Sequence, residues 1–503
     1  MNKPAFPLLY QLNTRATLNE RGVSLGRAAT LDDVPDTMLD RLAADGFDWI
    51  WLLGVWQTGD AGRRVSRTQP DWQPEYRELL IDYTADDVCG SPFAIADYVV
   101  NRDFGGPDAL DRLRRRIAAR GMKLMLDFVP NHTALDHPWA TQHPEYYIHG
   151  SDDDLSREPG TYVRLDTRGG SVVFAHGRDP SFPSWPDTLQ VNYRHPALRE
   201  AMAQTLERIA GQCDGVRCDM AMLVLPDVIE RTWGGRSDPA DAHAVDESFW
   251  PSAIERVRRR RQDFVFMAEV YWDLEWSLQQ QGFDYTYDKR LYDRLRDQNG
   301  PAVRGHLQAD AAYQRRSARF IENHDEPRAA AVFPPMVNRA AAVIAMLVPG
   351  LRLVHDGQST GRRLRMSNHL RRRAPEPIDR DLEAFYARLF ECLRRGEVRN
   401  GRWQLLAPEP AWDGNATSED VVAFSWDDDG RRLVVAVNYA PHQTQCYLRL
   451  PLADAGRGTI VLRDLMNPTI RYERDGEALA RAGLYLDVPP WRHHVFEVTA
   501  REA

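Results

Sequence analysis

Eight short apolar runs recur along the chain, and longer amphipathic segments separate them. Segments with helical periodicity include 107–121, 196–211, 337–348 and 379–396. This alternation is typical of parallel strands joined by crossover helices. Eight units in order predict an α/β fold whose strands close into a (β/α)8 TIM barrel, with a doubly wound sheet as the alternative. The predicted strands span residues 8–14, 47–56, 123–129, 215–220, 264–270, 283–288, 318–325 and 351–357.

Two regions depart from this alternation. About sixty residues rich in Asp, Pro, Gly and Trp follow the third run, although such a connection usually has two to six residues. We expect an inserted subdomain at 133–190, at the C-terminal face where barrel enzymes place their chemistry. After about residue 400 short alternating strands predict an antiparallel β-sandwich at 401–503. The barrel would then span 1–400.

The composition excludes some classes of partner. The net charge of -9 and the pI near 5.9 argue against a nucleic-acid partner, because phosphate backbones attract clustered positive charge. The five cysteines show no CxxC spacing, which favours a reducing compartment. The N-terminus has no apolar signal region, and no run approaches the roughly 18 apolar residues of a membrane span. We therefore expect a cytoplasmic protein without a membrane partner, and the oligomeric state stays open.

Several predicted strands end in a carboxylate. Asp127, Asp219, Glu269 and Asp325 close the third, fourth, fifth and seventh runs. On a barrel these ends meet around one axis, so four acids distant in sequence can share one pocket. Each acid alone could simply cap a helix or pair with an arginine, but four coincident placements favour a site. Arg217, two residues before Asp219, would bind that carboxylate, lower its pKa and keep it ionised.

A pocket of this kind suits the cleavage of a glycosidic bond. One carboxylate can attack the sugar while a second acts as general acid. A third acid and nearby histidines can bind sugar hydroxyls. The chain shows no phosphate-binding glycine loop and no serine or cysteine nucleophile motif.

Four stretches carry a resemblance to a known family. "DFVPNHT" (127–133), "GVRCDMAM" (215–222), "FMAEVYW" (266–272) and "FIENHDEPR" (320–328) resemble, in order, the sequence regions of the α-amylase family, glycoside hydrolase family 13. "PGLRLVHDGQ" (349–358) is similar to the region of its eighth strand. The resemblance covers nearly the whole chain and leaves the subfamily unidentified.

The resemblance implies three catalytic roles. Asp219 would be the nucleophile that forms a covalent β-glycosyl intermediate from an α-glycoside. Glu269 would be the general acid and base, and Asp325 would stabilise the transition state. Two displacements would retain the anomeric configuration.

It also implies a set of substrate-binding residues. Arg217 matches the arginine that supports the nucleophile, and His132 and His324 match histidines of the cleavage subsite. Phe93 stands where the family usually has a stacking tyrosine. Asp127, Tyr271, Trp272 and Arg328 complete the predicted substrate-binding set.

Other residues leave alternatives open. Met222 and Leu223 replace the Lys-His pair of many α-amylases, which argues against ordinary starch-chain specificity. Trp56, near the end of the second run, is a further candidate sugar contact. Asn131 matches a calcium-ligating position, but Ca²⁺ needs six to eight oxygens. We expect that no cofactor is required, and Ca²⁺ is possible but unsupported.

Three functional hypotheses follow. The first is a retaining hydrolase or transglycosidase that acts on α-glucans or α-glucosides. The second is a phosphorylase or glycosyltransferase that uses an anionic sugar such as a sugar phosphate, suggested by the arginine-rich segment 361–373. The third is a non-catalytic carbohydrate-binding homologue, which would be expected to lack at least one of the three acids.

Overall fold

The computed structural model describes residues 4–234, 248–451 and 458–501. Eight parallel strands close into a barrel in the order β1-β14-β13-β12-β11-β10-β5-β2, which confirms the predicted TIM barrel. Each predicted run overlaps one barrel strand, although β13 begins one residue before its predicted run and ends six residues before that run does. These are β1 (Leu8–Asn13), β2 (Trp49–Leu53), β5 (Lys123–Phe128), β10 (Gly215–Cys218), β11 (Val265–Ala268), β12 (Tyr285–Tyr287), β13 (Ser317–Arg319) and β14 (Leu351–His355).

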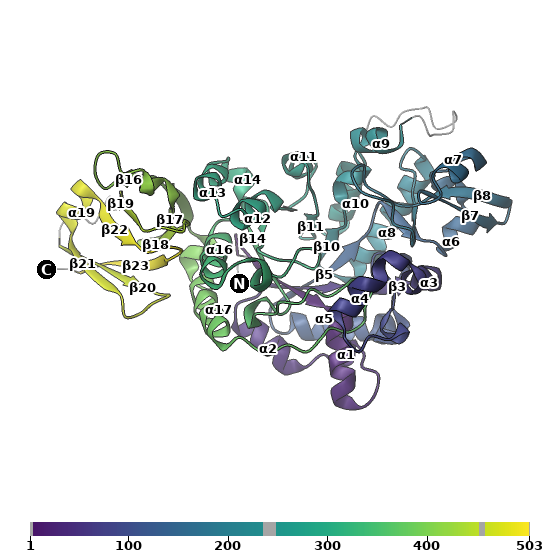
Figure 1. Ribbon diagram of the computed structural model, residues 1–503, viewed down its shortest axis with the longest axis horizontal. Coiled ribbons are helices and arrows are strands. Elements are labelled where there is room, and N and C mark those ends of the chain that lie inside the picture. Colours follow the sequence, from purple (N-terminus) through teal and green to yellow (C-terminus); the bar gives the residue numbers. More distant parts are fainter. Residues whose placement is uncertain (1–3, 235–247, 452–457, 502–503) are drawn as a thin grey trace.

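Helices surround the barrel because their apolar faces bury against its strands. The predicted helical segments form α5 (Gly106–Ala118), α8 (Pro196–Gln212), α16 (Pro335–Leu347) and α17 (Arg380–Leu393). In α5 the buried residues Leu110, Leu113 and Ile117 recur at helical spacing. The apolar α16 is buried almost throughout, since it lies between the barrel and the C-terminal sheets (Figure 1).

The register of neighbouring strands fixes which side chains enter the barrel. Arg217 on β10 pairs with Asp127 on β5 and with Met267 on β11. Paired residues on adjacent strands project to the same face of a sheet. Arg217 and Asp127 therefore share the inner face, and both are almost fully buried.

The insertion after β5 begins and ends at one small sheet. Strands β6 (His132–Ala134) and β9 (Thr188–Gln190) pair antiparallel, with His132 opposite Gln190. Between them lie α6 (Pro138–Gln142), α7 (Asp152–Arg157) and the hairpin of β7 (Tyr162–Thr167) and β8 (Gly170–Ala175). This pairing brings both ends of the insertion to the mouth of the barrel.

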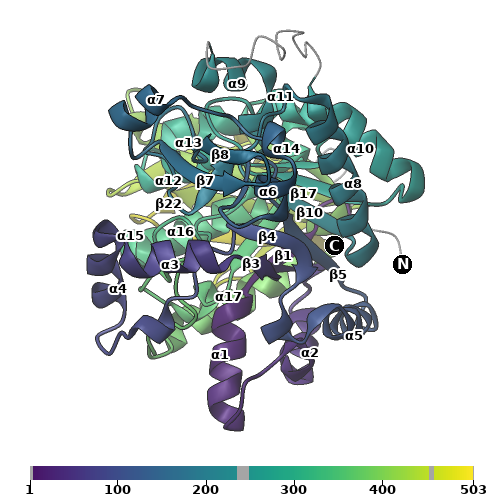
Figure 2. The same cartoon turned by 90° about the vertical axis from the view of Figure 1, so that its right-hand side faces the viewer.

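A second excursion follows β2 and was not predicted from the sequence. It contains β3 (Trp56–Thr58), α3 (Asp60–Thr68), α4 (Gln73–Leu79) and β4 (Ile95–Val100), and β3 pairs with β4. Figure 2 shows α3 and α4 on the same side of the molecule as the inserted strands β7 and β8. Two separate segments thus build up the wall around the barrel mouth.

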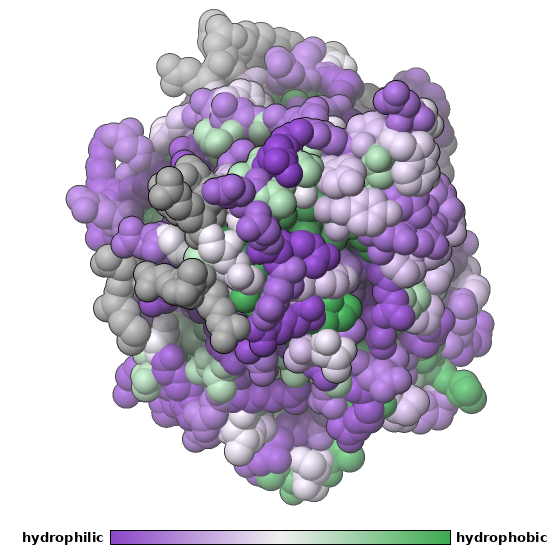
Figure 3. Space-filling view, turned by 90° about the vertical axis from the view of Figure 1, so that its left-hand side faces the viewer, coloured by the Kyte–Doolittle hydropathy of each residue, from purple (hydrophilic) through white to green (hydrophobic). Residues whose placement is uncertain are grey.

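The C-terminal region forms two antiparallel sheets. The larger sheet has the order β15-β17-β18-β23-β20-β21 and the smaller one β16-β19-β22. Buried side chains of both sheets share one core, with Cys446 and Leu486 from the smaller sheet beside Val434 and Phe496 from the larger. Figure 3 views the molecule from this end and shows a largely hydrophilic face with scattered hydrophobic residues. The bounds are β15 (Arg402–Leu406), β16 (Pro408–Pro410), β17 (Val421–Asp428), β18 (Arg431–Asn438), β19 (Thr444–Leu448), β20 (Thr459–Asp464), β21 (Arg471–Asp475), β22 (Leu484–Val488) and β23 (His493–Arg501).

Candidate active site

A cavity of about 320 Å³ opens at the C-terminal ends of the barrel strands, and Asp219, Glu269 and Asp325 all line it. Asp219 comes directly after β10 and Glu269 directly after β11. Asp325 follows β13 by six residues, in an irregular segment. Two strand ends and the segment after β13 therefore bring together the three acids for which the sequence predicted catalytic roles.

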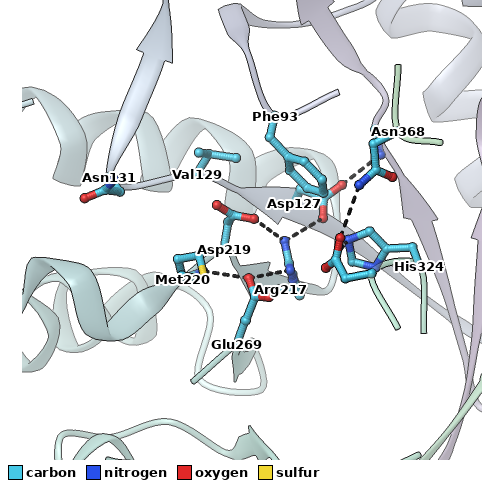
Figure 4. Close-up of polar contacts among 12 residues, drawn as sticks. Phe93, Asp127, Val129, Asn131, Arg217, Asp219, Met220, Glu269, His324 and Asn368 are labelled. Atoms are coloured by element: carbon cyan, nitrogen blue, oxygen red, sulfur yellow. Dashed lines mark hydrogen bonds and ion pairs between the residues drawn. The ribbon is translucent and has the colours of Figure 1, made fainter. Parts of the chain in front are cut away.

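One buried guanidinium joins two of these acids (Figure 4). The two terminal nitrogens of Arg217 donate to Asp219 Oδ1 at 2.6 Å and to Glu269 Oε2 at 2.5 Å. Asp127 Oδ1 lies 3.9 Å from the same guanidinium. Arg217 has no solvent exposure, and its charge is compensated by carboxylates on three different strand ends, as a buried charge requires.

Glu269 has two further hydrogen bonds. The Met220 amide donates to Oε2 at 2.8 Å and the Tyr271 hydroxyl donates to Oε1 at 2.8 Å. Met220 reaches this position with φ of 42°, a left-handed conformation that costs a non-glycine residue free energy. Strain of this kind is concentrated at functional sites.

Asp325 accepts one hydrogen bond and lies beside a histidine. Asn368 Nδ2 donates to Asp325 Oδ1 at 3.2 Å, and His324 Nε2 lies 3.0 Å from Asp325 Oδ2. Gln11 Nε2 lies 2.7 Å from His324 Nδ1. Since an amide nitrogen can only donate, Nδ1 is the acceptor and the neutral ring carries its proton on Nε2, which makes no hydrogen bond to the residues that the structure describes.

Burial controls the protonation of this cluster. It raises the pKa of Asp219, with Arg217 opposing the rise and Glu269 adding to it. Burial also raises the pKa of Asp325. The hydrogen bond from Arg217 to Asp219 is present, but its effect on the Asp219 pKa is smaller than that of burial. One guanidinium beside several buried carboxylates leaves excess negative charge, so the cluster retains a proton near neutral pH.

Three other predicted residues lie in or against the cavity. Phe93 lines it, with its ring 5.3 Å from the Arg217 guanidinium carbon and 5.4 Å from the His324 ring. His132 also lines it, and burial lowers the pKa of His132 to about 3, so the ring is neutral. Tyr271 adds an aromatic wall beside Glu269.

The structure places the remaining predicted residues behind or beside the cavity. Asp127 is occupied by hydrogen bonds from the Gly54 amide and from Trp51 Nε1. Arg328 is buried and donates to Glu322 at 2.6 Å. Trp272 has φ of 64° and lines a neighbouring cavity of about 400 Å³.

Trp56 is not a sugar contact, because it is 1% exposed and its Nε1 donates to the Asp127 carbonyl oxygen. It is a core residue.

The cavity also contains residues that the sequence reasoning missed. They come from the unpredicted excursion after β2, from the end of the insertion and from the segment after β14. Only the density of Trp, Asp and His in these loops could have pointed to them. They are Trp72, Ser91, Trp185, Asp187, Thr188, Asn368 and His369.

Asn131 is engaged by another side chain. Gln190 Nε2 donates to Asn131 Oδ1 at 2.9 Å, and Asn131 Nδ2 donates to Gln190 Oε1 at 3.2 Å. Two neutral amides thus satisfy each other where a Ca²⁺ site would need several oxygens turned to one point. The described residues contain no group of three or more His, Cys, Asp or Glu side chains placed to hold a metal ion.

A closed parallel barrel with carboxylates at its C-terminal rim is the architecture of a TIM-barrel enzyme. The family model for the α-amylase catalytic domain matches residues 46–384, and the chain belongs to this family. Among the described helices, none is both long and apolar enough to cross a bilayer.

Individual relatives are distant in sequence. The α-amylase MalA from Haloarcula japonica is 24% identical over 446 residues, covering 87% of this chain and 56% of MalA. An α-1,4-glucan:maltose-1-phosphate maltosyltransferase from Salinibacter ruber is 30% identical over 137 residues, 25% of this chain and 19% of that protein. The chain spans about half the length of the first curated relatives it matches.

Solved structures share the fold over the full length. The maltogenic α-amylase AmyB from Thermotoga neapolitana superimposes with a TM-score of 0.68, covers 99% of both chains and is 19% identical. At this identity the likeness concerns the fold alone.

Proposed function

We propose that this protein cleaves α-glucosidic bonds by double displacement with retention, as a hydrolase or transglycosidase. The observation that carries the proposal is the single Arg217 guanidinium with Asp219 on one terminal nitrogen and Glu269 on the other. Two carboxylates that bind the same guanidinium lie close together. Retaining enzymes need this short spacing, whereas inverting enzymes separate their carboxylates.

The contacts suggest a role for each acid. Asp219 attacks the anomeric carbon while Glu269 gives its proton to the leaving oxygen, which produces a glycosyl ester on Asp219. Glu269 then takes a proton from water or from an acceptor hydroxyl, and the ester bond breaks. Asp325, which accepts a hydrogen bond from Asn368, binds hydroxyls of the distorted sugar.

The same site requires no cofactor, because carboxylates supply both the nucleophile and the proton. The mutual hydrogen bonds of Asn131 and Gln190 support a site that functions without Ca²⁺. All five cysteines are free, which supports a cytoplasmic location.

The arginine-rich segment 361–373 gives little support to an anionic sugar substrate. Its arginines have partners within the protein, and five of the six pair with a carboxylate that compensates their charge. Arg362 and Arg373 pair with Glu20, Arg365 with Glu75, and Arg371 and Arg372 with Asp87, while Arg363 donates to the Ala330 carbonyl. The named activity of the Salinibacter relative keeps a sugar phosphate as the second candidate. A non-catalytic role has less support because all three acids line one cavity.

Product analysis tests the proposal. The protein is incubated with maltooligosaccharides, trehalose, sucrose and isomaltose, with and without phosphate, and products are followed by NMR from the first minutes. We expect α-anomeric products that do not depend on phosphate. A β-anomer as the first product would contradict double displacement, and a sugar phosphate formed only with phosphate would favour the second candidate.

A further inference from the structure

Asp187 is a fourth carboxylate in the cavity, and it lies outside the four sequence stretches that resemble the α-amylase family. It lies in the turn Trp185–Thr188 at the end of the insertion, closed by a hydrogen bond from the Thr188 amide to the Trp185 carbonyl at 3.1 Å. Its side chain lines the same cavity as Asp219, Glu269 and Asp325, yet it is only 3% exposed. Helix α3 approaches this turn through Gly62, where an added Cβ would lie 3.6 Å from the Asp187 Cβ.

The carboxylate of Asp187 is incompletely satisfied. Its Oδ2 atom is buried and accepts no hydrogen bond from the residues that the structure describes. Burial raises the pKa of Asp187 to about 7, as expected for a carboxylate removed from water without a cation beside it. Burial of this carboxylate costs free energy in the empty cavity, and hydrogen bonds from ligand hydroxyls would offset that cost.

The two ends of the cavity differ. Met220 and Tyr271, which flank Glu269, also line the neighbouring cavity with Phe182 and Trp272. The general acid must face the leaving group, so the leaving sugar or the acceptor belongs on this side. In Figure 4, Met220 and Glu269 lie on one side of Arg217 and Asn368 on the other.

The opposite end is closed by aromatic packing. The rings of Trp72 and His369 stack at 4.2 Å, and His369 Nδ1 lies 2.9 Å from Ser66 Oγ. Behind them a buried cluster seals the wall, and Arg365 pairs with Glu75 across it at 2.5 Å. The cluster consists of Tyr76, Leu80, Val88 and Leu370. This packing favours a cavity that ends at this wall, with the glycosyl unit to be transferred as the terminal sugar.

We propose that Asp187 is a specificity-determining residue that binds hydroxyls of the terminal sugar at this closed end, so that the enzyme removes units from the non-reducing ends of neutral α-glucosides. The inference rests on the proposed function and adds the end of the substrate chain from which sugars are removed. An ionised Asp187 would repel a phosphate or a uronic acid at the same place, which disfavours anionic donors there.

A pair of oligosaccharides tests the closed end without altering the protein. One is p-nitrophenyl α-maltoheptaoside with a free non-reducing end, and the other carries a 4,6-ethylidene acetal on its terminal glucose. Because the acetal removes the hydroxyls and adds bulk at the closed end, we expect at least about 100-fold slower release of sugars from the blocked chain. Similar rates on both would overturn the inference, while failure to cleave either would overturn the proposed function and the inference with it.

The role of Asp187 is tested with Asp187→Asn and with Asp153→Asn, an exposed aspartate on α7, as the matched control. We expect Asp187→Asn to lower kcat/KM on the free-ended substrate about 10- to 100-fold, mainly through KM, as lost hydrogen bonds to a charged group would. The control should match the parent. Unchanged KM in a folded Asp187→Asn protein would overturn the role of Asp187.

Discussion

Replacement of Glu269 by glutamine should remove the proton transfer at this site while keeping the shape of the side chain. The amide keeps the size of the side chain and can still accept the hydrogen bond from the Met220 amide. It cannot give or take the proton of the reaction. Its NH2 group must face either Arg217 or the Tyr271 hydroxyl, both of which donate to Glu269 in the parent.

The expected effects differ strongly in size. One mismatched buried hydrogen bond costs about 1–3 kcal/mol of stability, which leaves a protein of this size folded. General acid and base catalysis contributes roughly 10²- to 10⁴-fold, so we expect kcat on maltose to fall about 10³-fold, or about 4 kcal/mol of barrier at 1.36 kcal/mol per tenfold.

The assay compares maltose with α-glucosyl fluoride. Fluoride leaves without much protonation, so formation of the Asp219 ester should survive in Glu269→Gln and only its breakdown should be slow. Azide needs no general base, and its attack on C1 should break the ester, restore turnover and give α-glucosyl azide. Tyr271→Phe is the control, since it removes one hydroxyl donor and leaves the carboxyl group in place. Equal losses on both substrates with no effect of azide would refute the assignment of Glu269.

Four further predictions follow from individual contacts. Asp219→Ala should abolish turnover of maltose, and azide should then give β-glucosyl azide by direct attack, so the anomer formed distinguishes the role of Asp219 from that of Glu269. Asn368→Ala removes the hydrogen bond to Asp325 and should lower kcat about tenfold with an unchanged melting temperature. Glu322→Ala leaves the buried Arg328 without its carboxylate and should cost about 3–5 kcal/mol of stability in urea unfolding. Between pH 5 and 7 the parent should lose stability relative to Asp187→Asn. A folded-state pKa raised to about 7 makes the folded protein bind the proton of Asp187 more tightly than the unfolded chain does. The free energy of unfolding that this proton adds therefore declines as the pH rises from about 4 to 7.

The barrel was predictable because each of its strands can be recognised from a short stretch of sequence. A run such as Trp49–Leu53 is buried on both faces, and strands of this kind appear in sequence as continuous apolar segments. Asp219 and Glu269 line the cavity for the same reason, since strand ends of a parallel barrel share one rim, while Asp325 reaches it from a segment six residues beyond β13. The position of Asp127 behind that rim depends on the Gly54 amide and Trp51, contacts that no local pattern reveals.

The loops were less predictable because their partners are distant in sequence. Trp72 meets His369 across nearly three hundred residues, and neither segment has a period that indicates this contact. The arginines of 361–373 illustrate the same limit. Their charge suggested an anion site, but pairs such as that of Arg372 with Asp87 join loops whose proximity is set by the closed barrel.

The charge balance of the cavity connects the fold to the proposed reaction. Arg217 can compensate about one of the buried negative charges around it, so burial raises the pKa of Asp219 in the empty site. Double displacement needs an ionised nucleophile and a proton on the general acid. In the empty cavity Arg217 donates to Asp219 and to Glu269 at nearly equal distances. A glycosidic oxygen beside Glu269 can only accept a hydrogen bond, so a bound substrate favours the proton on Glu269 and leaves Arg217 to Asp219. We therefore expect the substrate itself to complete the assignment of acid and nucleophile.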